Sequence, residues 1–225
     1  MIKTHPTHAM LRAFAADELP LPLAVGVSAH CELCPECAAN LRACEEALAH
    51  QYLEPADEPA AMSESMPVEL DAMLAGILQQ PVASQAELGQ PMRPVPELQV
   101  AGQSYRLPRV LARHHAPKWR HIGTIRQHSL PLDEMGARAS LLHIEAGGRI
   151  PEHTHQGYEL TLLLAGNMQD GDTCYQAGDF IWRDASHAHS PHTPDGCLCY
   201  TVQDAPVQFT KGLSRLLNGI THRLY

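Results

Sequence analysis

The stretch that most constrains the fold of this chain is GGRIPEHTHQGYELTLLLAG, residues 147–166. In a β-strand, residues two apart share a face, so we expect His153 and His155 to point together into the interior of a β-structure. Glu159 adds a carboxylate after the turn that contains Gly157. Two imidazoles and one carboxylate suit zinc, iron, manganese, nickel or copper, so these residues predict a transition-metal site without selecting the metal.

The sequence around this stretch predicts an all-β region. From about residue 98 onward it contains short strand-like runs, such as ASLLHIEA, DFIWRDA and CLCYTVQD, which are separated by Gly, Asp and Pro. Such runs without alternating helices are typical of an antiparallel barrel or sandwich. Cys197 and Cys199 share one face of the last run, where we expect them to be buried as small apolar side chains; a thiol-sensor role is the less favoured alternative.

The N-terminal third follows helical spacing instead. Residues 8–19 and 36–53 place apolar side chains in helical register. The stretch 67–80 carries a single apolar stripe made of Leu70, Met73, Leu74, Ile77 and Leu78. The following residues, 81–97, contain four prolines and predict a semi-rigid linker. The sequence therefore predicts two domains, an α-helical one over residues 1–80 and a β one over residues 98–225.

A second cluster of candidate ligands is HCELCPEC, residues 30–37. His30 and Cys34 are four residues apart, so they share one face of a helix or a helix end, and Cys37 follows at a spacing that lets both thiolates reach one ion. A structural zinc site needs four such ligands, and His5 or His8 could fold back as the fourth. Zinc is favoured over a thioredoxin-like redox pair because no βαβ pattern surrounds the cysteines; a redox-labile zinc site combines both ideas, and simple packing is the remaining alternative.

The cysteine usage and the absence of an apolar run as long as a membrane helix predict the compartment in which the protein works. The longest apolar run, LPLPLAVGVSA at 19–29, is shorter than the roughly 18 residues of a membrane helix and is broken by Pro20 and Pro22. The N-terminus also lacks the pattern of a signal peptide. Seven cysteines without a secretion signal point to metal or thiol chemistry in a reducing compartment, with Cys31 and Cys44 assigned to packing. We therefore expect a cytoplasmic protein.

Charge is concentrated in the N-terminal third. Residues 1–70 hold three basic and eleven acidic residues, a net charge of −8 out of −9 for the whole chain. Such a segment repels phosphate backbones, so we do not expect it to bind nucleic acid directly. It would suit a basic protein partner, although plain solubility explains the charge equally well.

The N-terminal pattern resembles the zinc-binding anti-sigma domain, which carries an upstream histidine and an HxxxCxxC run. The resemblance implies a zinc site made of His5, His30, Cys34 and Cys37, in which His5 is preferred to His8 by its distance from the first helix. It also implies that this domain binds an extracytoplasmic-function sigma factor and blocks its engagement with RNA polymerase.

Residues 147–166 resemble the first cupin motif, and they match its defining positions at Gly147, His153, His155, Glu159 and Gly166. This resemblance implies a jelly-roll β-barrel and a second motif that supplies a fourth ligand for zinc or another divalent transition metal. AGDFIWRDASHAHSP, residues 177–191, contains the expected Gly-Asp turn. Aligned from that turn, the ligand is His189 rather than His187, although Asp184 and Ser186 replace the usual proline and glycine.

The two motifs in this order resemble the ChrR family of soluble anti-sigma factors, and the likeness covers nearly the whole chain. The family implies a regulator rather than an enzyme: the N-terminal domain holds the sigma factor, and the cupin domain is needed for its release on a signal, which is singlet oxygen or organic peroxide in the best-known case. Two alternatives stay open. One is a metal-dependent cupin enzyme, dioxygenase-like, with a zinc-bearing interaction module; the other is a metal-storage or metal-sensing protein.

Overall fold

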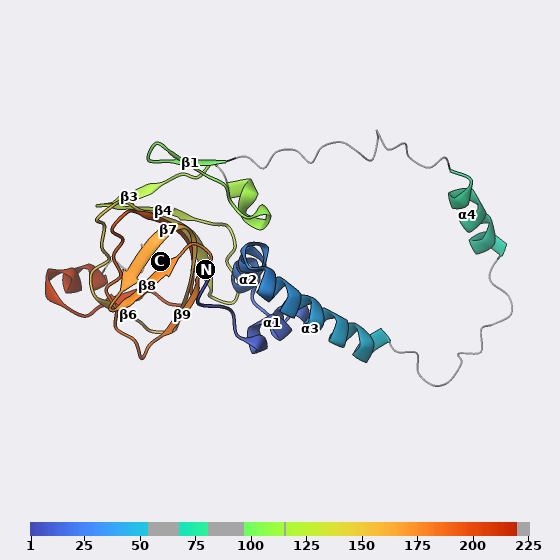
Figure 1. Cartoon of the computed structure of the whole chain (residues 1–225), viewed down its shortest axis with the longest axis horizontal. Helices are drawn as coiled ribbons and strands as arrows, with labels where there is room; N and C mark the ends of the chain where they lie inside the picture. The colour runs from blue at the N-terminus through green and yellow to red at the C-terminus, as the bar shows by residue number, and fades with distance from the viewer. Residues whose placement is uncertain (54–67, 81–96, 115, 220–225) are drawn as a thin grey trace. The chain divides into compact units, whose positions relative to one another are not determined.

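The computed structural model describes residues 1–53, 68–80, 97–114 and 116–219 (Figure 1). Residues 1–48 and 95–225 belong to one compact unit, and residues 49–94 belong to a second. The predicted linker at 81–97 lies outside the described residues except for Glu97, and the predicted domain boundaries stay a prediction. Within the described ranges, no helix is both long enough and apolar enough to cross a membrane.

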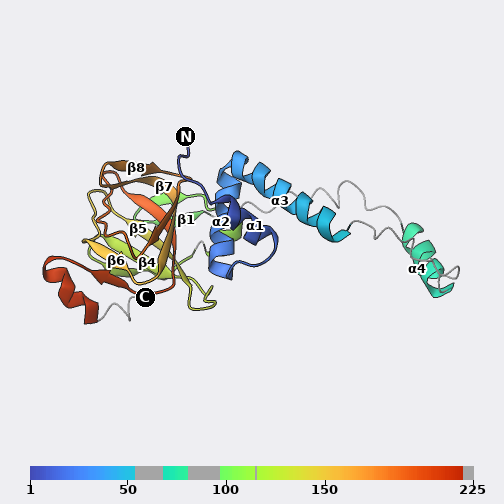
Figure 2. The ribbon, with the colours of Figure 1, turned by 90° about the horizontal axis from the view of Figure 1, so that it is seen from below.

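Three helices form the N-terminal region: α1 (His8–Ala15), α2 (Leu21–Leu33) and α3 (Pro35–Leu53) (Figure 2). The Thr7 hydroxyl accepts a hydrogen bond from the Met10 amide and begins α1, which ends at Ala15, earlier than the expected boundary at residue 19. Helix α2 was not predicted, because Pro20 and Pro22 were interpreted only as a break. They instead begin the helix, since the first amides of a helix need no acceptor within it.

Helix α4 (Val68–Leu78) belongs to the second unit and lies within the range predicted for it. Its five stripe residues are between 43% and 74% exposed. A helix that packs in a hydrophobic core buries its apolar stripe. A stripe this exposed to solvent is typical of a surface that binds another molecule.

The β region contains eleven strands in its described part, and every pairing between them is antiparallel. The strands are β1 (Leu98–Val100), β2 (Gln103–Tyr105), β3 (Arg120–Ile122), β4 (Ile125–Ser129), β5 (Arg138–Ile144), β6 (His153–His155), β7 (Tyr158–Asp170), β8 (Thr173–Gln176), β9 (Phe180–Asp184), β10 (Cys197–Gln203) and β11 (Val207–Phe209). Two 3₁₀ segments, η1 (Arg109–His114) and η2 (Gly212–Gly219), accompany them.

The main sheet has the order β3-β4-β5-β10-β7-β8, with β9 paired to β7, and β6 and β11 form a separate pair. Its strands curve around a common interior (Figure 1). The predicted combination of a helical N-terminal region and an antiparallel β region is thus confirmed. Gly166 interrupts the long strand β7 at φ +78°, where any Cβ would lie 2.1 Å from the Gly196 carbonyl oxygen, so this position requires glycine.

Strands β7 and β10 separate two apolar clusters. Leu160 and Tyr200 face outward, into a large core that also contains residues of α1, α2, α3 and η1. Leu163 and Cys199 face inward, into a smaller core inside the β region. Because side chains alternate along a strand, the same two strands carry helix α2 on one face and line the interior with the other.

Candidate metal centres

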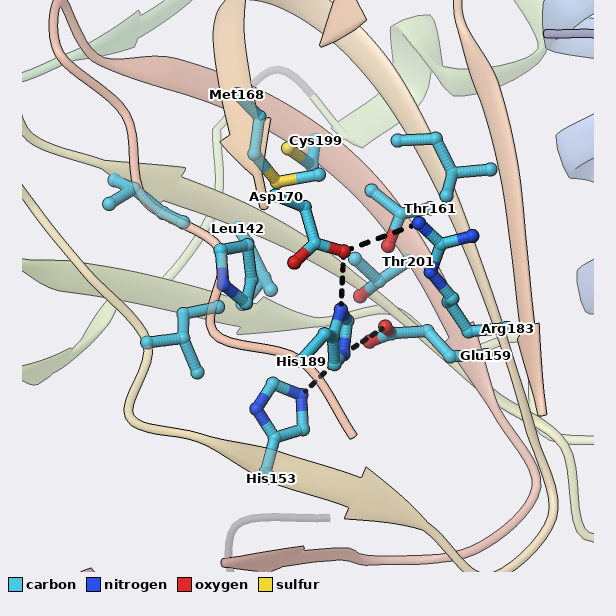
Figure 3. A pocket seen from close by; sticks show the side chains of 14 residues that line it. Leu142, His153, Glu159, Thr161, Met168, Asp170, Arg183, His189, Cys199 and Thr201 are labelled. Atoms are coloured by element: carbon cyan, nitrogen blue, oxygen red, sulfur yellow. Dashed lines mark hydrogen bonds and ion pairs between the residues drawn. The ribbon is translucent and has the colours of Figure 1, made fainter. Parts of the chain in front are cut away.

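The predicted cupin ligands come together inside the β region. Figure 3 shows three of them, His153, Glu159 and His189. His153 and His155 lie on β6, Glu159 lies at the start of β7, and His189 follows β9. The backbones of His153 and His189 exchange two hydrogen bonds, of 3.0 and 2.9 Å, which hold the last ligand against β6. One ligand atom from each of these four residues lies within 4.8 Å of the other three.

The distances between these ligand atoms fit a shared cation. The Nε2 atom of His189 lies 3.0 Å from Nε2 of His153 and 3.2 Å from Nε2 of His155. The Glu159 carboxylate lies 3.3 Å from Nε2 of His155. Metal–ligand bonds of about 2.0–2.2 Å place neighbouring ligand atoms about 3 Å apart, so the observed separations agree with one metal ion.

Burial sets the protonation states that a metal requires. It lowers the pKa of His153 to about 4, so this imidazole is neutral at physiological pH. Burial alone would raise the pKa of Glu159, but the hydrogen bond from His155 and the neighbouring imidazoles lower it to about 2. The site therefore offers a neutral His153 imidazole and an ionised Glu159 carboxylate.

Further side chains orient the ligands. Nδ1 of His153 lies 2.9 Å from the Pro151 carbonyl oxygen, and Nδ1 of His189 lies 3.2 Å from the Asp170 carboxylate, which leaves both Nε2 atoms for a metal. Asp170 is itself paired with Arg183 at 3.2 Å, and Gln203 donates a 2.8 Å hydrogen bond to Glu159. No motif in the sequence identified Asp170 or Gln203, because both act through contacts between distant strands.

His187, the alternative to His189, does not join this group. Its ring contacts the Asp184 carboxylate at 2.9 Å, and both side chains are more than half exposed. The structure thus places His189 with the other candidate ligands and His187 at the surface.

A cavity of about 360 Å³ opens beside the group. His153 and Glu159 contribute to its wall, which is otherwise mainly apolar and includes Ile125, Leu142 and Phe209. A smaller space of about 30 Å³ adjoins the same two ligands and is lined by Met168 and Cys199. Cys197 and Cys199 are buried, as expected, with their sulfur atoms 3.8 Å apart.

The predicted N-terminal ligand set, His5, His30, Cys34 and Cys37, also comes together. His30 is in the last turn of α2, Cys34 is the residue after that helix, and Cys37 is in the first turn of α3. The Nδ1 atom of His5 lies 3.5 Å from Sγ of Cys34 and 3.3 Å from Sγ of Cys37. Zn–S and Zn–N bonds of about 2.3 and 2.0 Å place tetrahedral N and S ligands roughly 3.5 Å apart, so these separations suit a tetrahedral zinc ion.

His30 supplies an independent observation for a metal. The His30 side chain is fully buried, and its Nδ1 atom lies 2.9 Å from the Gly178 carbonyl oxygen. Its Nε2 atom has no hydrogen-bond partner among the described residues. A buried nitrogen without a partner is costly unless a metal or another ligand satisfies it. Burial also lowers the pKa of His30 to about 4 and raises the pKa of the Cys37 thiol to about 12. The imidazole is therefore ready to bind, whereas the thiol ionises only when a cation compensates it.

The neighbouring histidine and cysteines lie outside the group. His8, the alternative to His5, has its Nε2 atom 3.8 Å from Sγ of Cys44. Cys31 and Cys44 are buried in the large apolar core, which agrees with the packing role predicted for them.

Comparison with known proteins agrees with this architecture. Residues 108–208 match the family described as the ChrR Cupin-like domain. The anti-sigma-E factor ChrR of Cereibacter sphaeroides is 33% identical over 219 residues, which cover 96% of this chain and 96% of that protein. The crystal structure of Rhodobacter sphaeroides SigE in complex with the anti-sigma ChrR matches with a TM-score of 0.66 and 27% identity, over 90% of this chain and 100% of the matched chain. On this likeness across almost its whole length, the chain belongs to the family of the anti-sigma factor ChrR.

Proposed function

We propose that this chain is a cytoplasmic anti-sigma factor that binds and inhibits an extracytoplasmic-function sigma factor. The observation that carries the proposal is the 33% identity to an anti-sigma-E factor over 96% of both chains. The structural match to an anti-sigma in complex with SigE supports the same partner class. The role that we infer is regulatory rather than enzymatic.

The partner surface is inferred from charge and exposure. The net charge of −8 over residues 1–70 favours a basic partner and would raise the rate of encounter with it. The exposed stripe of α4 provides an apolar helix face of the kind that docks into a groove of a partner. Leu74 and Ile77, near the middle and end of that stripe, are 48% and 57% exposed and would become buried in the complex.

We infer that both ligand groups hold metal ions. Two cysteines and two histidines are the ligand set of a structural zinc site, so we infer zinc at the site of His5, His30, Cys34 and Cys37. The ion would stabilise the junction of α2 and α3. Three imidazoles and a carboxylate at the cupin site accept zinc or another divalent transition metal. In each set, the four ligand atoms lie within 4.8 Å of one another, which supports this inference.

The release signal that we propose is oxidative and acts through the cupin site. Cys199 and Met168, two side chains that oxidants modify, line the small space next to His153 and Glu159. The larger apolar cavity beside the same ligands would admit a small organic molecule to the metal.

The test is inhibition of transcription by the purified full-length chain. The sigma factor encoded in the same genome would be combined with core RNA polymerase and a promoter that it recognises, and the chain would be added in increasing amounts. We expect transcription to stop near one chain per sigma factor, to resume on treatment with an organic hydroperoxide, and to be unaffected when a housekeeping sigma factor is used. Undiminished transcription at a large excess of metal-loaded chain would refute the proposed function.

A further inference from the structure

A turn of the β region reaches into the N-terminal group of His5, His30, Cys34 and Cys37, which we call the first metal site because it comes first in the sequence; the cupin site is the second. Gly178 and Asp179 lie between β8 and β9 and form the Gly-Asp turn of the cupin motif, and Phe180 is the first residue of β9. In this chain they contact residues 2–4, next to His5, and His30. Two of the four candidate ligands of the first site are therefore held from outside the helical region.

The turn anchors the N-terminal segment that carries His5. One carboxylate oxygen of Asp179 accepts hydrogen bonds from the backbone amides of Lys3, at 2.6 Å, and Thr4, at 2.9 Å. The Phe180 amide donates a 3.0 Å hydrogen bond to the Thr4 carbonyl oxygen. The second Asp179 oxygen accepts from the Gln176 amide at 2.8 Å, so the fully buried carboxylate ties residues 3–4 to the end of β8.

The same turn fixes the ring of His30. The Gly178 carbonyl oxygen lies 2.9 Å from Nδ1, and the Phe180 ring packs edge-on with its centroid 5.6 Å from that of His30. The His5 ring also packs edge-on against the His30 ring, and the two ring centroids are 5.5 Å apart. Because a carbonyl oxygen can only accept, Nδ1 carries the proton and Nε2 is left for the metal.

We propose that the turn Gly178–Phe180 is a structural component of the first metal site, and that Asp179 is a positioning residue for His5 and His30. A free N-terminal segment would lose its conformational freedom when His5 binds the metal, whereas a segment already anchored by Asp179 has lost that freedom in advance. The β region thereby raises metal affinity at a site whose thiolates lie at the junction of α2 and α3. A change in the cupin turn thus has a physical route to the first metal.

Cobalt provides a probe that distinguishes the two sites. Only the first site contains cysteine ligands, so only cobalt bound there gives a thiolate-to-cobalt charge-transfer absorption. The full-length, metal-free chain would be titrated with Co²⁺ in the presence of a competing chelator. The charge-transfer band then reports affinity at the first site, and total bound cobalt minus the cobalt at the first site reports occupancy of the cupin site.

The variant Asp179→Ala removes the acceptor of both backbone amides. Partners that orient ligands from outside the coordination shell typically contribute about 10–100-fold to metal affinity, and we expect a loss of this size at the first site with cobalt retained at the cupin site. Asp172→Ala is the matched control, since it removes an exposed carboxylate from the neighbouring β7–β8 turn. Thr4→Pro is a second test from the other side of the contact, because it removes one of the two amide donors without changing the β region.

Unchanged affinity of the first site in both Asp179→Ala and Thr4→Pro would overturn the proposal, as would an equal loss at both sites. If Asp179→Ala does not fold, Thr4→Pro decides. The inference rests on the proposed function only in assuming that the first site binds a metal. Absence of the charge-transfer band in the unmodified chain would refute that assumption, whereas its presence with wild-type affinity in the variants would refute the positioning role alone.

Discussion

Substituting Gly26 by alanine tests the packing of α2 on the β region most directly. Gly26 lies in the middle of α2, where the helix crosses Leu160 of β7 and Tyr200 of β10. A Cβ atom at this position would lie 2.5 Å from Cδ2 of Leu160 and 3.3 Å from Cε1 of Tyr200. Ordinary contacts between carbon atoms are about 3.5–4.0 Å long, so the helix or the Leu160 side chain must move by about 1 Å.

The expected loss of stability follows from this contact. Leu160 and Tyr200 are fully buried, and the Tyr200 hydroxyl donates a 2.7 Å hydrogen bond to the Pro22 carbonyl oxygen, so neither side chain can move freely. Inserting a methyl group into such a core costs about 1–3 kcal/mol. The higher helix propensity of alanine returns up to about 1 kcal/mol. The difference spans about 0–3 kcal/mol. Because both contacting side chains are held in place, we expect a net destabilisation in the middle of this range, about 1–2 kcal/mol, which lowers Tm by about 2–8 °C in a chain of this size.

The assay is thermal unfolding of the metal-loaded chain, followed by far-ultraviolet circular dichroism. Gly76→Ala is the matched control: it is the same substitution in helix α4, but a Cβ atom there meets nothing within 4 Å. We expect Gly76→Ala to leave the transition unchanged or to raise it slightly. If Gly26→Ala is as stable as Gly76→Ala, then α2 does not pack on β7 and β10 as described.

Three further substitutions test the sites separately. Asp170→Asn weakens the contact that orients His189, so we expect metal affinity to fall about 10–100-fold at the cupin site alone, as measured by chelator competition. Cys37→Ser should reduce total bound metal from two ions to one per chain in elemental analysis, with the loss in zinc, whereas Cys174→Ser, which alters an exposed cysteine, should retain both ions. Ile77→Asp should weaken sigma-factor binding about 10-fold or more without changing metal content, because burial of an isoleucine side chain is worth about 1.5–3 kcal/mol; wild-type affinity in a binding titration would exclude α4 from the interface.

The ligands could be predicted to the extent that their spacing is local. His153 and His155 share a strand face because they are two residues apart, and the spacing of His30, Cys34 and Cys37 matches a junction between helices. His5 and His189 are distant from the other ligands in sequence, and only the family resemblance placed them. In the structure both lie within the predicted groups, whereas His8 and His187 lie outside them.

Contacts between distant segments could not be predicted from periodicity. A hydrophobic pattern indicates which face of an element is buried, but not which element covers it, so the shared core of α2, β7 and β10 was not foreseen. The same holds for Asp170 and Asp179, whose partners lie in other strands or at the N-terminus. Gly26 illustrates the limit well: no helix was predicted around it, whereas in the structure it permits close approach of α2 to Leu160.

The arrangement of β7 and β10 suggests why a cupin domain can influence the helices next to it. Leu160 faces α2, while its neighbours Glu159 and Thr161 line the space around the second metal site. Only one layer of backbone therefore separates a candidate metal ligand from the contact with Gly26. A ligand or oxidant influences a distant partner only if its interaction free energy differs between two arrangements of the protein, and a displacement of β7 would change both faces at once. The Gly26→Ala variant acts on the same strand from the helix side, so a lower metal affinity at the cupin site in this variant would support coupling through β7. Lower stability with unchanged metal affinity would show that α2 packs on the strand without influencing the metal site.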